Sequence, residues 1–132
     1  MTNGDIRVAV GTDIVEVERI GAAIKRFRNA FLAKVFTADE LAHCAKSAIC
    51  HPSLAARFAA KEAFSKALAT GIGIGSPLKW QDVSVQSQAS GAPEIILSPS
   101  AGDLMERRGF SRVSVSLAHS KMLAQAVVIL TS

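Results

Sequence analysis

The chain of 132 residues contains no tyrosine, one tryptophan and two cysteines. Because aromatic residues make up only 5% of it, we expect a core built mainly from alanine, valine, isoleucine and leucine. Two cysteines do not make a disulfide framework and no Cys-x-x-Cys pair indicates zinc, so Cys44 and Cys50 are interpreted as small buried thiols. No apolar run approaches the roughly 20 residues of a membrane span, and no cationic segment precedes a long apolar run at the amino terminus. We therefore expect a soluble, cytoplasmic protein without membrane attachment.

Composition and charge favour one globular domain with an anionic partner. Hydrophobic residues make up 49% of the chain and charged residues 20%. We expect residues 1–132 to form a single domain, which is large enough to bury its own hydrophobic core without a metal or disulfides. The net charge of +4 favours a polyanion, which could be nucleic acid, a phosphate-bearing ligand or an acidic protein. Basic residues do not alternate with aromatic residues and no nucleic-acid module is recognisable, so nucleic acid is not the expected partner.

The hydrophobic periodicity predicts an α+β domain, with helices mainly in the first half and antiparallel strands mainly in the second. Residues 6–10 alternate as in a half-buried strand, which Gly11 is expected to end. Apolar residues at three- and four-residue steps then predict an amphipathic helix over 14–31. Asp13 would lie where the strand meets that helix, and the ordinary role of an aspartate there is to cap the helix.

Further elements follow from the same kinds of pattern. A capping box from Thr37 to Glu40 begins a short helix that runs through Lys46, and His51-Pro52-Ser53 separates it from a helix over 53–68. The remaining elements are strands at 82–86, 94–97, 112–118 and 122–130, and a helix over 101–108 capped by Ser100.

The predicted helix over 53–68 is apolar almost all round, yet it carries charged side chains on two sides. Glu62 and Lys66 share one side, which an exposed ion pair one turn apart would explain. A metal site is the alternative, because Mg²⁺ takes one or two carboxylates and completes its shell with water and phosphate oxygens. Asp13 and Glu62 could supply those carboxylates, and Lys66 would add positive charge for phosphate chemistry.

Three other features have ordinary explanations beside functional ones. The glycine-rich segment from Gly71 to Gly75 follows a helix, so it matches neither a Rossmann fingerprint nor a P-loop and could simply end that helix. His119 falls between two predicted strands, where a turn residue is the ordinary interpretation. The predicted helix over 14–31 and the residues after it carry a run of basic side chains, namely Arg19, Lys25, Arg26, Arg28 and Lys34. This positive face could simply be solvated, or it could dock an acidic helical protein.

Several segments of the chain carry motifs of recognisable composition and spacing. The first runs from Gly11-Thr-Asp13-Ile to Arg19-Ile20, and the second runs from Arg57 through Lys-Glu62 to Lys66-Ala-Leu. Other segments follow, namely Gly71-Ile-Gly73, Trp80-x-Asp82-Val83, Gly91-Ala-Pro93 and Val115-Ser-Leu-Ala-His119. In their residues and their order these segments resemble the signatures of holo-[acyl-carrier-protein] synthases, and the resemblance covers nearly the whole chain.

The resemblance implies an enzyme that transfers the 4′-phosphopantetheine arm of coenzyme A to a serine of apo acyl carrier protein, in support of fatty acid biosynthesis. Adenosine 3′,5′-bisphosphate would be released. The resemblance also implies Mg²⁺ dependence, the compact 4′-phosphopantetheinyl transferase fold and a homotrimer with active sites between subunits. Two alternatives remain, which are a transferase dedicated to a polyketide-type carrier and a non-catalytic basic module that binds an acidic protein.

Functional residues are carried over by position. Asp13 and Glu62 match the metal ligands, and Lys66 matches a lysine near the coenzyme A phosphates. The serine proton would go to His119 or to a metal-bound water, so His119 completes the candidate catalytic set. The family usually has serine or threonine in place of Ala118, so one hydrogen bond near the pantetheine arm is expected to be missing. Other positions match the coenzyme A site (Arg57, Lys66, Gly71, Gly73, Pro93 and His119) and the surface for the acidic carrier (Arg19, Lys25, Arg26 and Arg28).

Overall fold

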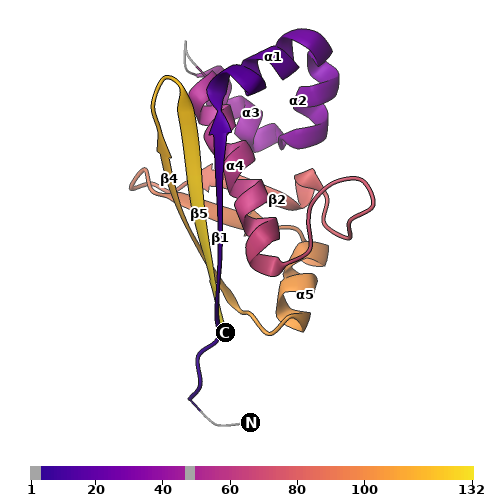
Figure 1. Cartoon of the computed structure of the whole chain (residues 1–132), viewed down its shortest axis with the longest axis vertical. Coiled ribbons are helices and arrows are strands. Elements are labelled where there is room, and N and C mark those ends of the chain that lie inside the picture. The colour runs from indigo at the N-terminus through magenta and orange to yellow at the C-terminus, as the bar shows by residue number, and fades with distance from the viewer. Residues whose placement is uncertain (1–3, 47–49) are drawn as a thin grey trace.

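The computed structural model describes residues 4–46 and 50–132, and it confirms the α+β expectation (Figure 1). A strand and three helices come first: β1 (Val8–Glu16), α1 (Val17–Phe27), α2 (Asn29–Val35) and α3 (Ala38–Ala45). The long helix α4 (His51–Leu68) and a short 3-10 helix (Trp80–Asp82) follow. The second half contains β2 (Val83–Ser87), β3 (Pro93–Leu97), α5 (Pro99–Arg107), β4 (Arg112–His119) and β5 (Leu123–Thr131). No helix in these residues has the length and apolarity needed to cross a membrane.

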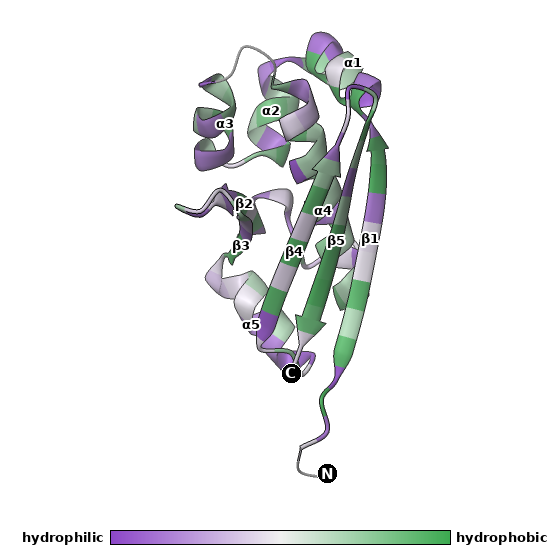
Figure 2. Ribbon diagram, turned by 90° about the vertical axis from the view of Figure 1, so that its left-hand side faces the viewer, coloured by the Kyte–Doolittle hydropathy of each residue, from purple (hydrophilic) through white to green (hydrophobic). Residues whose placement is uncertain are grey.

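The strands form two antiparallel sheets. One sheet has the order β1-β5-β4, and β2 and β3 form the other. Helix α4 packs on the larger sheet, whose middle strand β5 is hydrophobic along most of its length (Figure 2). The alternate β5 residues Ala124, Ala126, Val128 and Leu130 are fully buried. Helix α4 meets them with small side chains, and this helix is buried on nearly all sides as its composition predicts.

Strand β1 is longer than predicted, and this changes the position of Asp13. Strand β1 pairs with β5 from Val8 to Glu16, so Gly11 and Asp13 lie within the strand and helix α1 begins only at Val17. The prediction that Asp13 caps a helix is therefore wrong. Gly11 does not end the strand because its missing side chain serves packing: a Cβ atom there would overlap the backbone of α4 at Ala63 and Ala67.

Three other helix boundaries differ from the prediction. The predicted helix over 14–31 is broken at Arg28, whose backbone has φ 47° and ψ −126°, so α1 and α2 are separate helices. Helix α4 begins at His51 because Pro52 is tolerated in a first helical turn, where no intrahelical amide donor is needed. Helix α5 is capped by Ser98, whose Oγ accepts from the Ala101 amide at 3.2 Å, and not by Ser100 as predicted.

Candidate active site

Asp13 and Lys66 form an ion pair between β1 and α4. The Asp13 side chain is on the face of β1 that α4 covers, and Lys66 Nζ donates to Asp13 Oδ1 at 2.9 Å. The same ammonium donates to the Thr12 carbonyl at 3.1 Å. The Lys66 side chain remains 54% exposed and that of Asp13 17% exposed. The two hydrogen bonds of Lys66 therefore orient the pair, and its lysine side stays open to solvent.

Glu62 lies one helical turn before Lys66, beside the same aspartate. Burial, followed by the negative charge of Asp13, raises the pKa of Glu62 from its ordinary 4.5, while Lys66 opposes the shift. A carboxyl group whose ionisation is disfavoured by a neighbouring carboxylate is an arrangement that a divalent cation relieves. The described residues contain no group of three or more His, Cys, Asp or Glu side chains that could hold a metal. Asp13 and Glu62 thus fit Mg²⁺ only with further oxygens from water or a phosphate ligand, which is how Mg²⁺ is ordinarily bound.

A second group of candidates lies beside a cavity of ≈ 270 Å³ that Arg57, Pro93 and His119 line together. Its wall also includes Ser87 and Gly91, from the end of β2 and the connection to β3. Arg57 is only 6% exposed, because its Nε donates to the Val85 carbonyl at 3.2 Å and its Nη1 to Ser53. The structure therefore brings three of the residues expected to bind coenzyme A to one place.

The two groups lie at opposite edges of the larger sheet. Asp13 is on β1 and His119 is on β4, with β5 between these strands. Neighbouring strands lie about 4.8 Å apart, so β1 and β4 are separated by roughly 10 Å across the sheet. Asp13 pairs with Ala126 of β5 and His119 with Ala124, so the two residues are also offset by two positions along the strands. Within one chain, the candidate catalytic set is therefore divided: Asp13, Glu62 and Lys66 come together, and His119 lies apart from them.

The glycines of the predicted coenzyme A site lie in the loop after α4. Gly71 and Gly73 have φ of 72° and 100°, a left-handed conformation that favours glycine. The Gly73 amide donates to the Leu78 carbonyl at 2.8 Å, and its missing side chain makes room for Trp80. Neither glycine lines the cavity beside His119. Their loop begins three residues beyond Lys66, on the carboxyl-terminal side of α4.

The basic residues of the expected docking surface are exposed on α1 and at its end. Arg19, Lys25 and Arg26 lie on α1, and Arg28 lies at the break before α2. Lys25 also lines the largest described cavity, ≈ 1030 Å³, between α1, the start of α4 and the β4–β5 turn. Glu18 lines the same cavity, so the basic surface is continuous only on the Arg19 and Arg26 side of the helix.

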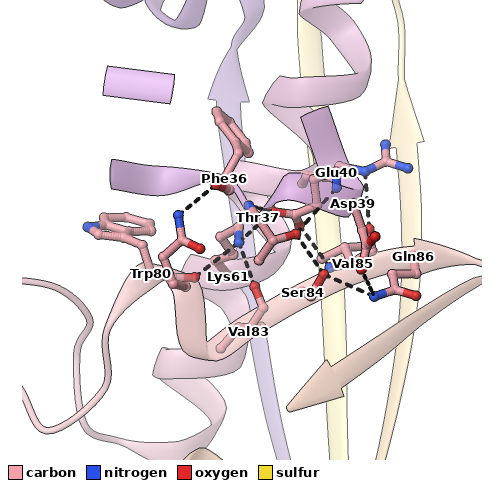
Figure 3. Close-up of polar contacts among 12 residues, drawn as sticks. Phe36, Thr37, Asp39, Glu40, Lys61, Trp80, Val83, Ser84, Val85 and Gln86 are labelled. Carbon is pink, nitrogen blue, oxygen red and sulfur yellow. Dashed lines mark hydrogen bonds and ion pairs between the residues drawn. The ribbon is translucent and has the colours of Figure 1, made fainter. Parts of the chain in front are cut away.

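A buried ion pair between Glu40 and Lys61 was missed by sequence reasoning. Their charged atoms are 2.8 Å apart and neither side chain has any exposed surface (Figure 3). The capping box at Thr37 is confirmed, with Glu40 Oε1 accepting from the Thr37 amide at 2.8 Å. Glu40 thus has two roles. A lysine in a helix that is apolar nearly all round was the only available sign of a buried partner.

Comparisons with known proteins identify the family of this chain. A family model described as the 4'-phosphopantetheinyl transferase superfamily matches residues 9–126. A holo-[acyl-carrier-protein] synthase from Syntrophus aciditrophicus is 44% identical over 120 residues, which are 91% of this chain and 92% of that protein. One from Moorella thermoacetica is 43% identical over 122 residues, which are 92% of each chain.

Solved structures of similar proteins share the fold. The Neisseria meningitidis holo-[acyl-carrier-protein] synthase has a TM-score of 0.84 and 35% identity, with 92% of this chain and 96% of that chain covered. The Helicobacter pylori holo-[acyl-carrier-protein] synthase, solved in complex with coenzyme A, has a TM-score of 0.79 and 35% identity, with 92% and 98% covered. The resemblance seen in the motifs is confirmed over most of the chain. This chain belongs to the 4′-phosphopantetheinyl transferase superfamily.

Proposed function

We propose that this protein transfers the 4′-phosphopantetheine arm of coenzyme A to a serine hydroxyl of an apo acyl carrier protein. In this reaction the serine oxygen bonds to the phosphorus that carries pantetheine, the phosphoanhydride bond breaks, and adenosine 3′,5′-bisphosphate leaves. The observation that carries the proposal is the cluster of Asp13, Glu62 and Lys66 in a chain whose relatives are named holo-[acyl-carrier-protein] synthase. A role in fatty acid biosynthesis and a cytoplasmic location go with this proposal.

The cluster suits phosphate chemistry through its charges. Asp13 and Glu62 would hold Mg²⁺, which when bound offsets negative charge on the pyrophosphate of coenzyme A and on the leaving group. Lys66 keeps Asp13 oriented through its ion pair and has an exposed side chain, so its ammonium can also reach a bound phosphate. Glu62, with its raised pKa, gains most from a cation because the cation favours its ionised form.

A second copy of the chain is needed to complete the site. The sheet face turned away from α4 exposes apolar side chains of β1 and β5, namely Val8, Val10, Ile14, Leu123 and Ile129. Exposed apolar surface of this kind is typical of an interface. We infer a homotrimer in which the β1 edge of one copy faces the β4 edge of the next. Coenzyme A would then span Asp13 and Glu62 of one copy and Arg57, Pro93 and His119 of another, where His119 could accept the serine proton.

The carrier protein would dock beside this composite site. Arg19 and Arg26 present positive charge on the exposed side of α1, which complements an acidic carrier helix. Arg28 adds charge at the end of α1, and Lys25 adds charge on the side of the helix that lines the large cavity. Attraction between exposed charges accelerates encounter and is screened by salt, so the KM for the carrier should rise with ionic strength.

Mixed assemblies test the proposed function and the shared site together. Asp13→Ala protein and His119→Ala protein should each be folded and nearly inactive, because each loses one half of every site. Mixing the two under conditions that exchange subunits should restore part of the activity, since some sites then combine an intact β1 edge with an intact β4 edge. Near-normal turnover by Asp13→Ala protein alone would contradict the metal assignment. Absence of recovery in verified mixed assemblies would contradict the shared site.

A further inference from the structure

The outer edge of β2 is held by side chains in place of a neighbouring strand. Strand β2 pairs with β3 on one side, and its other edge faces α3 and α4. The Val85 amide donates to Glu40 Oε2 at 2.8 Å, and the Val85 carbonyl accepts from Arg57. The Val83 carbonyl accepts from Lys61 Nζ at 2.5 Å (Figure 3). Three charged side chains thus satisfy the backbone groups that a strand partner would otherwise satisfy.

The buried ion pair between Glu40 and Lys61 makes the full set of hydrogen bonds available to its charged groups. Lys61 Nζ donates to Glu40 Oε1 and to the carbonyls of Val83 and Trp80, which uses all three ammonium protons. Glu40 accepts from Lys61 and from the amides of Thr37 and Val85. No buried side-chain nitrogen or oxygen in the described residues lacks a partner. Since a buried ion pair adds little net stability over apolar side chains, its directional bonds are its more distinctive contribution.

These bonds connect the two halves of the candidate site. Lys61 immediately precedes Glu62 on α4, and Arg57 lies one turn earlier on the side that faces β2. Strand β2 ends at Ser87, which lines the cavity together with Gly91 and Pro93, and these three residues are called the Ser87–Pro93 wall. Arg57 from α4 lines the same cavity. Movement of β2 along α4 would therefore change the shape of this cavity without displacing Asp13 or Glu62.

We propose that Glu40 and Lys61 are positioning residues for coenzyme A, because they fix the edge of β2 on α4 and so hold the Ser87–Pro93 wall at its distance from Arg57. Neither residue lines the cavity itself. The identity of that ligand rests on the proposed function. The pair should accordingly determine the affinity for coenzyme A and leave the rate of the metal-dependent step nearly unchanged.

The double variant Glu40→Gln/Lys61→Met tests this proposal. It removes both charges together, keeps similar side-chain sizes and leaves an amide oxygen to accept from α3 or β2. The Val83 and Trp80 carbonyls lose their common donor. We expect the Kd of coenzyme A, measured by calorimetry, and its KM to rise about tenfold, because small misplacements in a preorganised site have large effects. The kcat and the KM for carrier protein should stay within about twofold.

A matched control separates positioning from loss of stability. Leu104→Ala removes a buried side chain of α5 that is neither part of the Glu40–Lys61 pair nor among the residues lining the cavity. It should lower the Tm without changing the affinity for coenzyme A. Trp80 supplies a second readout, because it is the single tryptophan and stacks on Phe58 with ring centroids 5.0 Å apart. Its fluorescence emission should shift in the double variant and not in the control.

Each outcome decides one point. A double variant that loses stability but binds coenzyme A as the wild type does would overturn the positioning role. Should the double variant fail to fold, Glu40→Asp replaces it, because it keeps both charges and withdraws the carboxylate from the Val85 amide by one methylene. A KM for coenzyme A within error of the wild type would then overturn the proposal. A wild-type protein that neither binds coenzyme A nor transfers its arm would overturn the proposed function instead, and the positioning role with it.

Discussion

Replacing Gly11 by alanine should separate β1 from α4 at the site of the carboxylate cluster. Gly11 lies in β1 two residues before Asp13, and the backbone of α4 passes directly over it. A Cβ atom at this position would lie 2.6 Å from the Ala67 amide nitrogen and closer still to the Ala63 carbonyl oxygen. Both are backbone atoms, so no side-chain rotation can relieve the overlap.

The size of the effect follows from these contacts. Ordinary van der Waals contact begins at 3.4 Å, so the strand and the helix must part by at least about 0.8 Å at Ala67. Overpacking of this kind costs about 1–3 kcal/mol of the free energy of unfolding. The same displacement acts on the distance between Asp13 and Glu62, and a shift of about 1 Å in a catalytic arrangement can reduce turnover about a hundredfold.

Urea denaturation and carrier modification would measure the two effects of Gly11→Ala separately. Gly102→Ala is the matched control, because Gly102 lies in helix α5 and a Cβ there meets no atom within 4 Å. The control should keep full activity and gain about 0.5–1 kcal/mol, as alanine favours a helix over glycine. A Gly11→Ala protein as stable and as active as the wild type would refute the packing argument.

Three further predictions concern pH, docking and assembly. Burial and the charge of Asp13 raise the pKa of Glu62, so the folded protein binds the carboxyl proton of Glu62 more tightly than the unfolded chain does. The free energy of unfolding therefore falls as the pH rises from 4.5 through the raised pKa. Glu62→Gln should therefore raise the Tm of the metal-free protein at neutral pH and give a smaller gain below pH 4.5; a pH-independent difference would contradict this. Arg19→Glu should raise the KM for carrier protein about tenfold and the KM for coenzyme A less than twofold, and equal increases would remove Arg19 from the docking surface. Val10→Asp, at a position 59% exposed on the outer sheet face, should give a folded but inactive monomer by light scattering; a variant with wild-type mass would refute the interface.

Elements with a strong local signal were predictable from the sequence. The strands of the second half are close to their predicted ranges because their apolar residues alternate, and α4 is close to its own because Pro52 and Gly71 flank a long run rich in alanine. The carboxylates of the cluster were predictable as well, because Asp13 and Glu62 interrupt otherwise apolar segments.

The remaining features depend on contacts between distant segments. Gly11 looks like a strand terminator until the approach of Ala63, 52 positions further along the chain, explains the missing side chain. The Glu40–Lys61 pair joins helices α3 and α4. The sequence around Glu40 explains it as a capping residue, and the sequence around Lys61 explains it as part of a charged helix side, so neither residue indicates the other. The break at Arg28 has no sequence signal either, since arginine rarely adopts a positive φ.

The most direct test of the proposed activity is the intact mass of an apo acyl carrier protein after incubation with this protein, coenzyme A and Mg²⁺. A parallel sample with EDTA removes the divalent cation. We predict that the carrier gains the mass of one phosphopantetheine arm only in the sample with metal, since phosphate transfer at two carboxylates needs a cation between them. An unmodified carrier in the presence of metal, with folded enzyme and with fatty-acid and polyketide carriers both tried, would contradict the proposed function. Full modification in EDTA would contradict the role assigned to Asp13 and Glu62.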